Sequence, residues 1–186
     1  MKKKSISLIL AVLLCLSSLG LPALAAGESP YPEELYLRQN RSGTCTLCAA
    51  TMMLRAKLYP EDSDAALALT ENDVASAAWC SEGLIWAWSY VAGGYTMNVA
   101  HASVGGLTVD GLNAILAEHP EGIVLYCGHQ PHAVFVTNFE DGIFYCADPA
   151  TGEWTPLADS VLYYSGQNEI LRNVTAYWYI DSITAA

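Results

Sequence analysis

One cysteine of the chain stands where a thiol nucleophile would be placed. Cys45 follows the polar, glycine-containing stretch Ser42-Gly43-Thr44 and opens a run of apolar residues at helical spacing, which predicts a helix over residues 45–57 with a cap just before it. At the first turn of a helix, unpaired backbone N–H groups and the positive end of the dipole favour a thiolate. The thiolate is the nucleophilic form, so Cys45 is predicted to attack a carbonyl carbon.

A base and a group to orient it are predicted in the C-terminal half. His132 opens a strand-like run, and Asp148 lies 16 residues later at the end of the next such run. The stretch Glu140-Asp141-Gly142 between them is typical of a tight turn. An antiparallel hairpin would return Asp148 to His132, where a carboxylate holds one ring nitrogen as N–H and leaves the other facing the thiol.

Gln39 completes the candidate site, because it lies six residues before Cys45 and an acyl-transfer reaction needs donors for the developing oxyanion. Its side-chain amide and the Cys45 backbone N–H are the candidates. The parts of the pattern are the glutamine, the cysteine on a helix, His132-Ala133-Val134 and Asp148-Pro149. This pattern resembles papain-like cysteine peptidases, and most closely the bacteriocin-processing (double-glycine leader) peptidase-like group. The resemblance implies that these four side chains serve as oxyanion donor, nucleophile, base and orienting carboxylate.

The resemblance covers residues 39–53 and 122–149, and it implies a papain-like fold and hydrolysis of peptide bonds without a cofactor or metal. Thr44-Cys45-Thr46 departs from the Asp-Cys-Gly usual in the family. Two alternatives from other functional classes remain open. One is a catalytically inactive papain-like domain that serves as an extracellular binding module, and the other is a transglutaminase-like acyltransferase.

The elements that must position these residues change in type along the chain. Helices are expected at 45–57, after Thr70, where Asp73 completes a capping-box pattern, and at 109–118. Strands are expected as a hairpin within 84–104 and over 122–127, 132–138, 143–147 and 174–180. Helices followed by an antiparallel sheet indicate an α+β fold, with N-terminal helices packed on a C-terminal sheet.

The N-terminus and the charge restrict location and partners. Residues 1–25 combine three lysines, an apolar run and Ala23-Leu24-Ala25, which is typical of a secretory signal peptide, so residues 26–186 are expected to form one secreted or cell-surface domain. That part holds five Lys and Arg against 19 Asp and Glu, a formal charge of −14. This excess argues against nucleic acid and anionic membrane. We expect a monomer that acts on a peptide or protein substrate.

Other cysteines, histidines and aromatic residues allow alternative interpretations. Cys48 is expected in the core, and Cys45-Thr46-Leu47-Cys48 also matches a redox pair or half of a zinc site completed by Cys127 and His129 or His132. His129 is the rival base, although a loop position would leave its ring unfixed. The alternation of Trp86, Trp88 and Tyr90 favours core packing over a substrate groove. The disulfide state of Cys48, Cys80, Cys127 and Cys146 stays open.

Overall fold

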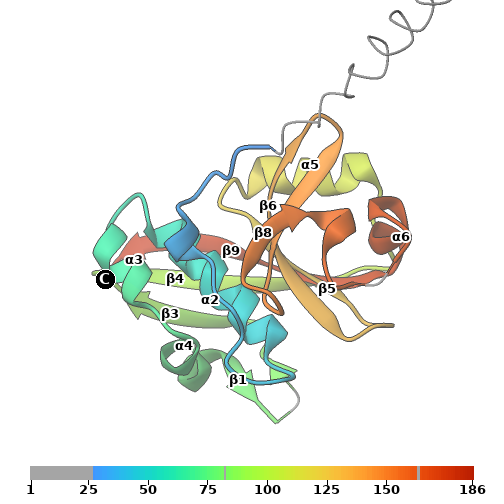
Figure 1. Cartoon of the computed structure of the whole chain (residues 1–186). Helices are drawn as coiled ribbons and strands as arrows, with labels where there is room; N and C mark the ends of the chain where they lie inside the picture. Colours follow the sequence, from blue (N-terminus) through green and yellow to red (C-terminus); the bar gives the residue numbers. More distant parts are fainter. Residues whose placement is uncertain (1–26, 82, 163) are drawn as a thin grey trace, which may run out of the picture.

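A computed structural model describes residues 27–81, 83–162 and 164–186, and it has a mixed α+β architecture with helices first and an antiparallel sheet after them (Figure 1). The predicted signal peptide, residues 1–25, lies outside the described residues. The helices are η1 (Glu33–Leu35), α2 (Cys45–Leu58), α3 (Ser63–Ala68), α4 (Glu71–Ala78), α5 (Val109–Glu118), η2 (Leu157–Asp159) and α6 (Gln167–Arg172). The strands are β1 (Trp79–Cys80), β2 (Gly83–Leu84), β3 (Trp88–Ala92), β4 (Tyr95–Ser103), β5 (Ile123–Cys127), β6 (His132–Glu140), β7 (Ile143–Asp148), β8 (Glu153–Pro156) and β9 (Val174–Ala185).

The larger sheet has seven strands in the order β3-β4-β9-β5-β6-β7-β8, and all its pairings are antiparallel. The last strand in sequence, β9, lies inside the sheet, between β4 and β5. β1 and β2 form a separate small hairpin. Through β9, the β3–β4 hairpin belongs to the same sheet as the strands that carry His132 and Asp148. The hairpin itself carries no predicted catalytic residue.

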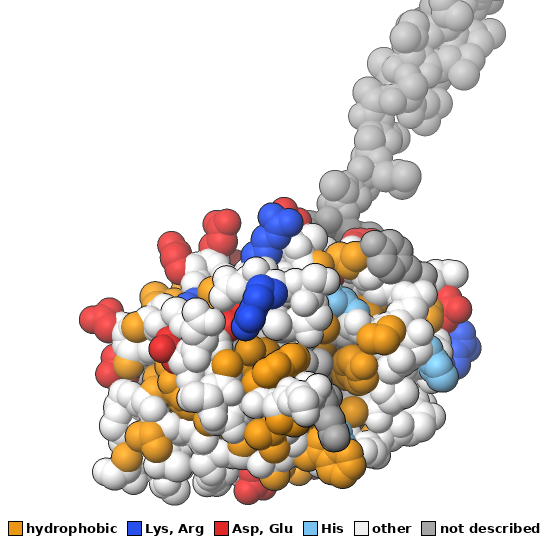
Figure 2. Space-filling model, turned by 90° about the horizontal axis from the view of Figure 1, so that it is seen from below, with side chains coloured by type: hydrophobic (Ala, Val, Ile, Leu, Met, Phe, Trp, Pro, Cys, Tyr) orange, Lys and Arg blue, Asp and Glu red, His pale blue; other side chains and the backbone are white. Residues whose placement is uncertain are grey.

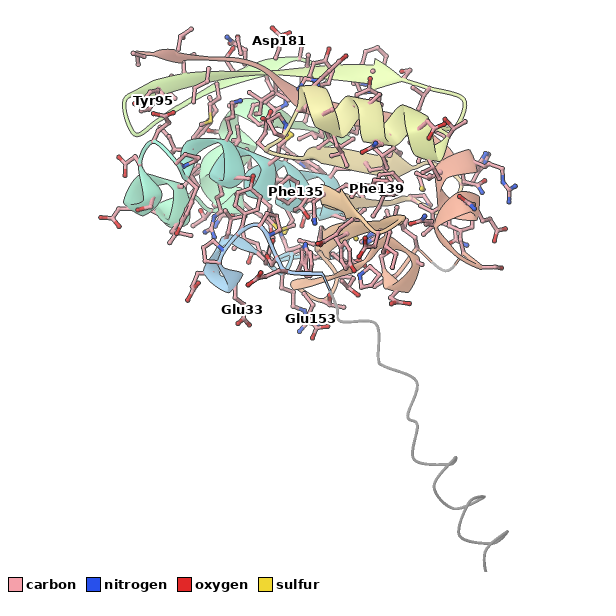
Figure 3. The ribbon with its side chains drawn as sticks, turned by 90° about the horizontal axis from the view of Figure 1, so that it is seen from above. Glu33, Tyr95, Phe135, Phe139, Glu153 and Asp181 are labelled. Carbon is pink, nitrogen blue, oxygen red and sulfur yellow. The ribbon has the colours of Figure 1, made fainter. Side chains whose placement is uncertain are left out.

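Both faces of the sheet are covered, which explains why the central strands are apolar at nearly every position rather than alternating. Helix α2 packs on the face that presents Val124 and Phe135, whereas α5, α6 and η2 cover the face that presents Leu125 and Val134. Phe135 lies inside the molecule in Figure 3, and Glu33 and Glu153 lie on its periphery.

The β6–β7 hairpin forms at the predicted turn but contains a bulge that the sequence analysis did not foresee. Asp141 and Gly142 have φ values of 49° and 83°, as the two central residues of a type I′ turn require. If the pairing continued from this turn without interruption, Asp148 would pair with Phe135. The Asp148 side chain would then project from the face of the sheet opposite to that of His132. A bulge at Thr137 shifts the register so that Phe135 pairs with Ala147, and Asp148 then projects from the same face as His132.

Helix α2 begins at Cys45 as predicted, but Thr44 does not cap it through its side chain. The Thr44 hydroxyl instead donates to the Arg41 carbonyl oxygen at 2.9 Å. The preceding Gly43 adopts a φ of 87°, which a residue with a Cβ rarely adopts. No side chain therefore occupies the free N–H groups around Cys45. The helix is buried at every residue except Lys57, not along one face only.

Arg55 links this buried helix to two other segments. Its guanidinium is buried and donates to the carbonyl oxygens of Glu34 at 2.8 Å, Leu67 at 2.9 Å and Leu69 at 2.9 Å. These bonds connect α2 to the N-terminal segment and to the chain around the end of α3. Arg55 thus satisfies carbonyl groups that would otherwise be buried without donors.

We expect Arg55→Met to lower the free energy of unfolding by about 3 kcal/mol, because it leaves several buried carbonyl groups unpaired. Urea denaturation followed by circular dichroism would measure the change. Arg172→Met is the matched control, since Arg172 is exposed in the last turn of α6, and it should change stability by no more than about 0.5 kcal/mol. Equal effects of the two substitutions would contradict the role given to Arg55.

Several elements differ from the predictions. The helix after Thr70 has its capping box, and the helix at 109–118 and the main strands lie where expected. The short elements α3, α6, β1, β2 and β8 were not predicted, because each is too short to show a periodicity. Trp86 lies before β3 and is 69% exposed, so its assignment to the core was wrong. Within the described residues no helix is both long and apolar enough to span a bilayer.

Candidate active site

The structure brings Cys45, His132 and Asp148 into one row. Cys45 is the first residue of α2, His132 the first of β6 and Asp148 the last of β7. His132 Nε2 lies 2.7 Å from Asp148 Oδ1, and the His132 ring and the Cys45 thiol are close enough for each to shift the pKa of the other. With one ring nitrogen on the carboxylate, the other is left for the sulfur. This is the order that a thiol, its base and an orienting acid require.

Asp148 is fixed by more than the imidazole. Its Oδ1 accepts from the Ala150 backbone N–H at 2.9 Å, and its Oδ2 accepts from the Val161 backbone N–H at 2.7 Å. The residue is 1% exposed. Burial alone would raise the pKa of the Asp148 carboxyl, but the bonds from His132, Val161 and Ala150 outweigh it and hold the pKa below its usual value. The carboxylate is therefore ionised, oriented and shielded from water.

The Cys45–His132 pair favours the charged forms of both groups. Burial works against this, since it raises the pKa of the Cys45 thiol and lowers that of the imidazole. The mutual hydrogen bond and charge interaction prevail, with help to the thiolate from the backbone of Ala133 and Thr46 and to the imidazolium from Asp148. The pKa of Cys45 is thereby lowered and that of His132 raised to about 9. Both shifts favour a thiolate–imidazolium pair.

These pKa shifts predict different pH dependences for alkylation and for amide hydrolysis. Iodoacetamide needs only the thiolate, so the alkylation rate of Cys45 should rise with a midpoint below the ordinary thiol value of about 8.5. Hydrolysis also needs a proton from His132, so its rate should fall above about pH 9, where the imidazolium deprotonates. Site-resolved mass spectrometry would follow alkylation, and release of a fluorophore from a peptide would follow hydrolysis.

Two variants make this pH test specific. In His132→Ala the alkylation midpoint of Cys45 should move above that of the native protein, because burial then acts on the thiol without the imidazolium to oppose it. In His129→Ala it should stay unchanged, since His129 is exposed in the turn before β6. A native midpoint at or above that of a free cysteine would refute the ion pair.

Gln39 lies on the same side of the molecule as the row, in a surface cavity of about 340 Å3 that it shares with His132. Its backbone N–H donates to the Pro149 carbonyl oxygen at 2.8 Å, which ties it to the residue after Asp148. Among the described residues its Oε1 atom is buried without a hydrogen-bond partner. Buried amide atoms are rarely left unpaired in proteins, so this oxygen is available to accept from a donor that enters the cavity.

The remaining cysteines do not compete with Cys45. All five cysteines of the described part are free thiols. Burial raises the pKa of Cys48, Cys127 and Cys146, and Cys48 belongs to the core as predicted. Cys80 is exposed. Among the described residues no group of three or more His, Cys, Asp or Glu is arranged to hold a metal ion.

A cleft of about 500 Å3 adjoins Cys45 and contains residues that the sequence analysis did not assign to the site. Trp86 and His101 line it, as does Trp178, which pairs with His101 across β4 and β9. Figure 2 views the molecule from below, where the β1–β2 hairpin lies in Figure 1, and hydrophobic side chains gather on this face. The clustering of aromatic residues was visible in the sequence, but the pairing of strands 80 residues apart was not.

Comparison of the chain with protein-family models, with curated proteins and with solved structures gave no significant match.

Proposed function

We propose that the chain is a secreted cysteine peptidase with a papain-like fold. The observation that carries the proposal is the row of Cys45, His132 and Asp148 at the mouth of a cleft. Such a row is costly to maintain without a use, because it buries three ionisable groups. The secretory-signal pattern in residues 1–25 supports secretion, and the resemblance described above supports the class of reaction.

The first chemical step is attack of the Cys45 thiolate on the carbonyl carbon of a peptide bond. The carbonyl π electrons move to oxygen, and the tetrahedral intermediate carries one negative charge there. The free N–H of Cys45 and the side-chain amide of Gln39 are the donors proposed for that oxyanion. The donor atom would be Gln39 Nε2, and the Gln39 side chain lines a cavity together with His132.

The second step breaks the carbon–nitrogen bond. The imidazolium of His132 gives its proton to the leaving nitrogen, a free amine departs, and a thioester remains on Cys45. Neutral His132 then takes a proton from water, whose oxygen attacks the thioester carbon and releases a carboxylic acid. The thiolate and imidazolium are restored. Asp148 keeps the ring oriented through both transfers without accepting a proton.

Thiol-dependent peptide hydrolysis tests the proposal directly. Purified protein would be incubated with a broad library of quenched-fluorescent peptides, with and without prior treatment with iodoacetamide. We expect hydrolysis that alkylation of Cys45 removes, with peptide mapping used to separate the Cys45 adduct from alkylation of the exposed Cys80. His132→Ala should lower hydrolysis by at least about 100-fold, and the neighbouring His129→Ala should leave it unchanged.

Other outcomes identify the competing classes. Absence of thiol-dependent hydrolysis across the library would contradict the peptidase proposal and favour a noncatalytic binding domain. Diversion of the product by added amine, with little free acid formed, would instead identify an acyltransferase that uses the same residues.

A further inference from the structure

The cleft beside Cys45 is walled by aromatic rings. Trp79 and Leu84 come from the β1–β2 hairpin, Trp86 follows it, and His101, Tyr126 and Trp178 come from the sheet. The β4–β9 pairing places the rings of His101 and Trp178 side by side, with their centroids 4.8 Å apart. The cleft therefore brings together residues from five strands and one loop.

One face of the Trp86 indole is covered by another ring, and the rest of the side chain is largely exposed. Its ring stacks on His101 with centroids 5.1 Å apart and planes 5° from parallel. His101 in turn contacts the edge of Trp178, and the Trp178 indole N–H donates to the Ile85 carbonyl oxygen at 3.0 Å. Although it is packed in this way, Trp86 remains 69% exposed. A large fixed apolar surface thus faces the cleft.

Apart from Cys45 itself, the described lining of the cleft carries no charge, although residues 26–186 are strongly acidic. The described lining residues include no Asp, Glu, Lys or Arg. Burial lowers the pKa of His101, so its ring is neutral at neutral pH. A charged side chain entering this cleft would lose water without gaining a partner, whereas a planar apolar side chain would gain contact with the rings.

The position of the cleft relative to His132 shows which part of a substrate it would hold. The leaving amine must receive its proton from His132, which lines the smaller cavity with Gln39. The acyl part becomes bonded to the Cys45 sulfur, which lines the aromatic cleft. Pro131 borders both cavities. The aromatic cleft therefore lies on the acyl side of the bond to be cleaved.

We propose that this cleft selects peptides that carry an uncharged aromatic side chain on the acyl side of the scissile bond. The inference rests on the proposed peptidase function and names its substrate class. It also separates this chain from peptidases of the double-glycine type that it resembles, because glycines have no side chain with which to fill a cleft of about 500 Å3.

Matched substrates test the selection. One acyl-side position of a peptide would be varied at a time, and Phe, Tyr, Ala, Glu or Lys would be placed there. The resulting peptides would be compared by kcat/KM. At one position Phe and Tyr should exceed Ala by at least about 10-fold, and Glu and Lys should fall below Ala. Trp86→Ala should remove most of the advantage of Phe while changing the Ala peptide by less than about twofold. Val91→Ala is the control, since Val91 is also an exposed hydrophobic residue but does not line the cleft.

A binding measurement separates failure of this inference from failure of the proposed function. The best Phe peptide would be titrated into Cys45→Ala and into Cys45→Ala combined with Trp86→Ala, and tryptophan fluorescence and calorimetry would report its affinity. We expect the second substitution to weaken binding at least about fivefold. Hydrolysis without aromatic preference would overturn the inference and leave the peptidase function standing. Aromatic-selective binding without any hydrolysis would overturn the peptidase function and uphold the assignment of the cleft.

Discussion

Replacing Cys45 with Ala should lower kcat/KM for peptide hydrolysis by at least about 1,000-fold while the protein stays folded. In the proposed mechanism Cys45 supplies the atom that forms the covalent bond. Among the other described thiols, Cys48, Cys127 and Cys146 are buried with raised pKa values, and Cys80 lies in the β1–β2 hairpin. The substitution removes one sulfur and adds no bulk. Initial rates on the best library peptide would measure the loss, and thermal unfolding would verify the fold.

Cys48→Ala is the matched control, because Cys48 lies one turn further along α2. It is fully buried, and its thiol donates to the Leu37 carbonyl oxygen at 3.4 Å. We expect a loss of about 1 kcal/mol in stability with hydrolysis retained. Retained hydrolysis in Cys45→Ala would show that the sulfur of Cys45 is not the nucleophile.

Asp148→Asn should lower both activity and stability. The carboxylate accepts bonds from His132, Ala150 and Val161, and an amide offers only one oxygen to these donors. We expect kcat to fall by about 100- to 1,000-fold, because the imidazolium loses its counter-charge and its fixed orientation. The free energy of unfolding should fall by about 3 kcal/mol, since buried donors lose an acceptor.

The pH dependence of this stability loss follows from the direction of the pKa shift. The pKa of Asp148 is lowered in the folded protein, so its stabilising effect is complete above the unfolded value of about 3.9 and disappears as pH falls through the folded value. The difference in unfolding free energy between native protein and Asp148→Asn should therefore be full at pH 7 and shrink below about pH 4. Urea denaturation across this range would measure it.

Asp159→Asn serves as the control for Asp148→Asn, because Asp159 is an exposed acid in η2. It should change stability by no more than about 0.5 kcal/mol and leave hydrolysis intact. If both Asp variants behaved alike, the carboxylate of Asp148 would have no special part in orienting His132.

The sequence predicted most of the site because each part has a local signature. A cysteine after a glycine-containing loop, a histidine at a strand start and an Asp-Gly turn are all recognisable over a few residues. The α+β order of the elements followed from the same local patterns. The structure confirms the α+β order and brings Cys45, His132 and Asp148 together, while their catalytic roles stay a prediction.

Features that depend on contacts between distant parts of the chain were not predictable in this way. The aromatic cleft requires Trp86, His101 and Trp178, which are brought together only by the pairing of β4 with β9. Trp86 looked like a core residue because it alternates with Trp88, but β3 begins after it. Arg55 has the sequence context of a surface residue on a helix, and its buried role depends on carbonyl groups of two other segments.

The bulge at Thr137 has a consequence for how this site tolerates change. The Thr137 hydroxyl accepts from the Trp154 indole N–H at 2.9 Å and donates to Asn138 Oδ1 at 2.7 Å, so strand β8 helps to hold the extra residue in place. Many side chains in β6 could be exchanged without moving His132 relative to its acid. Losing or gaining a single position between them would reverse which side of the sheet the acid occupies. The catalytic row is thus sensitive to the length of the strand more than to its composition.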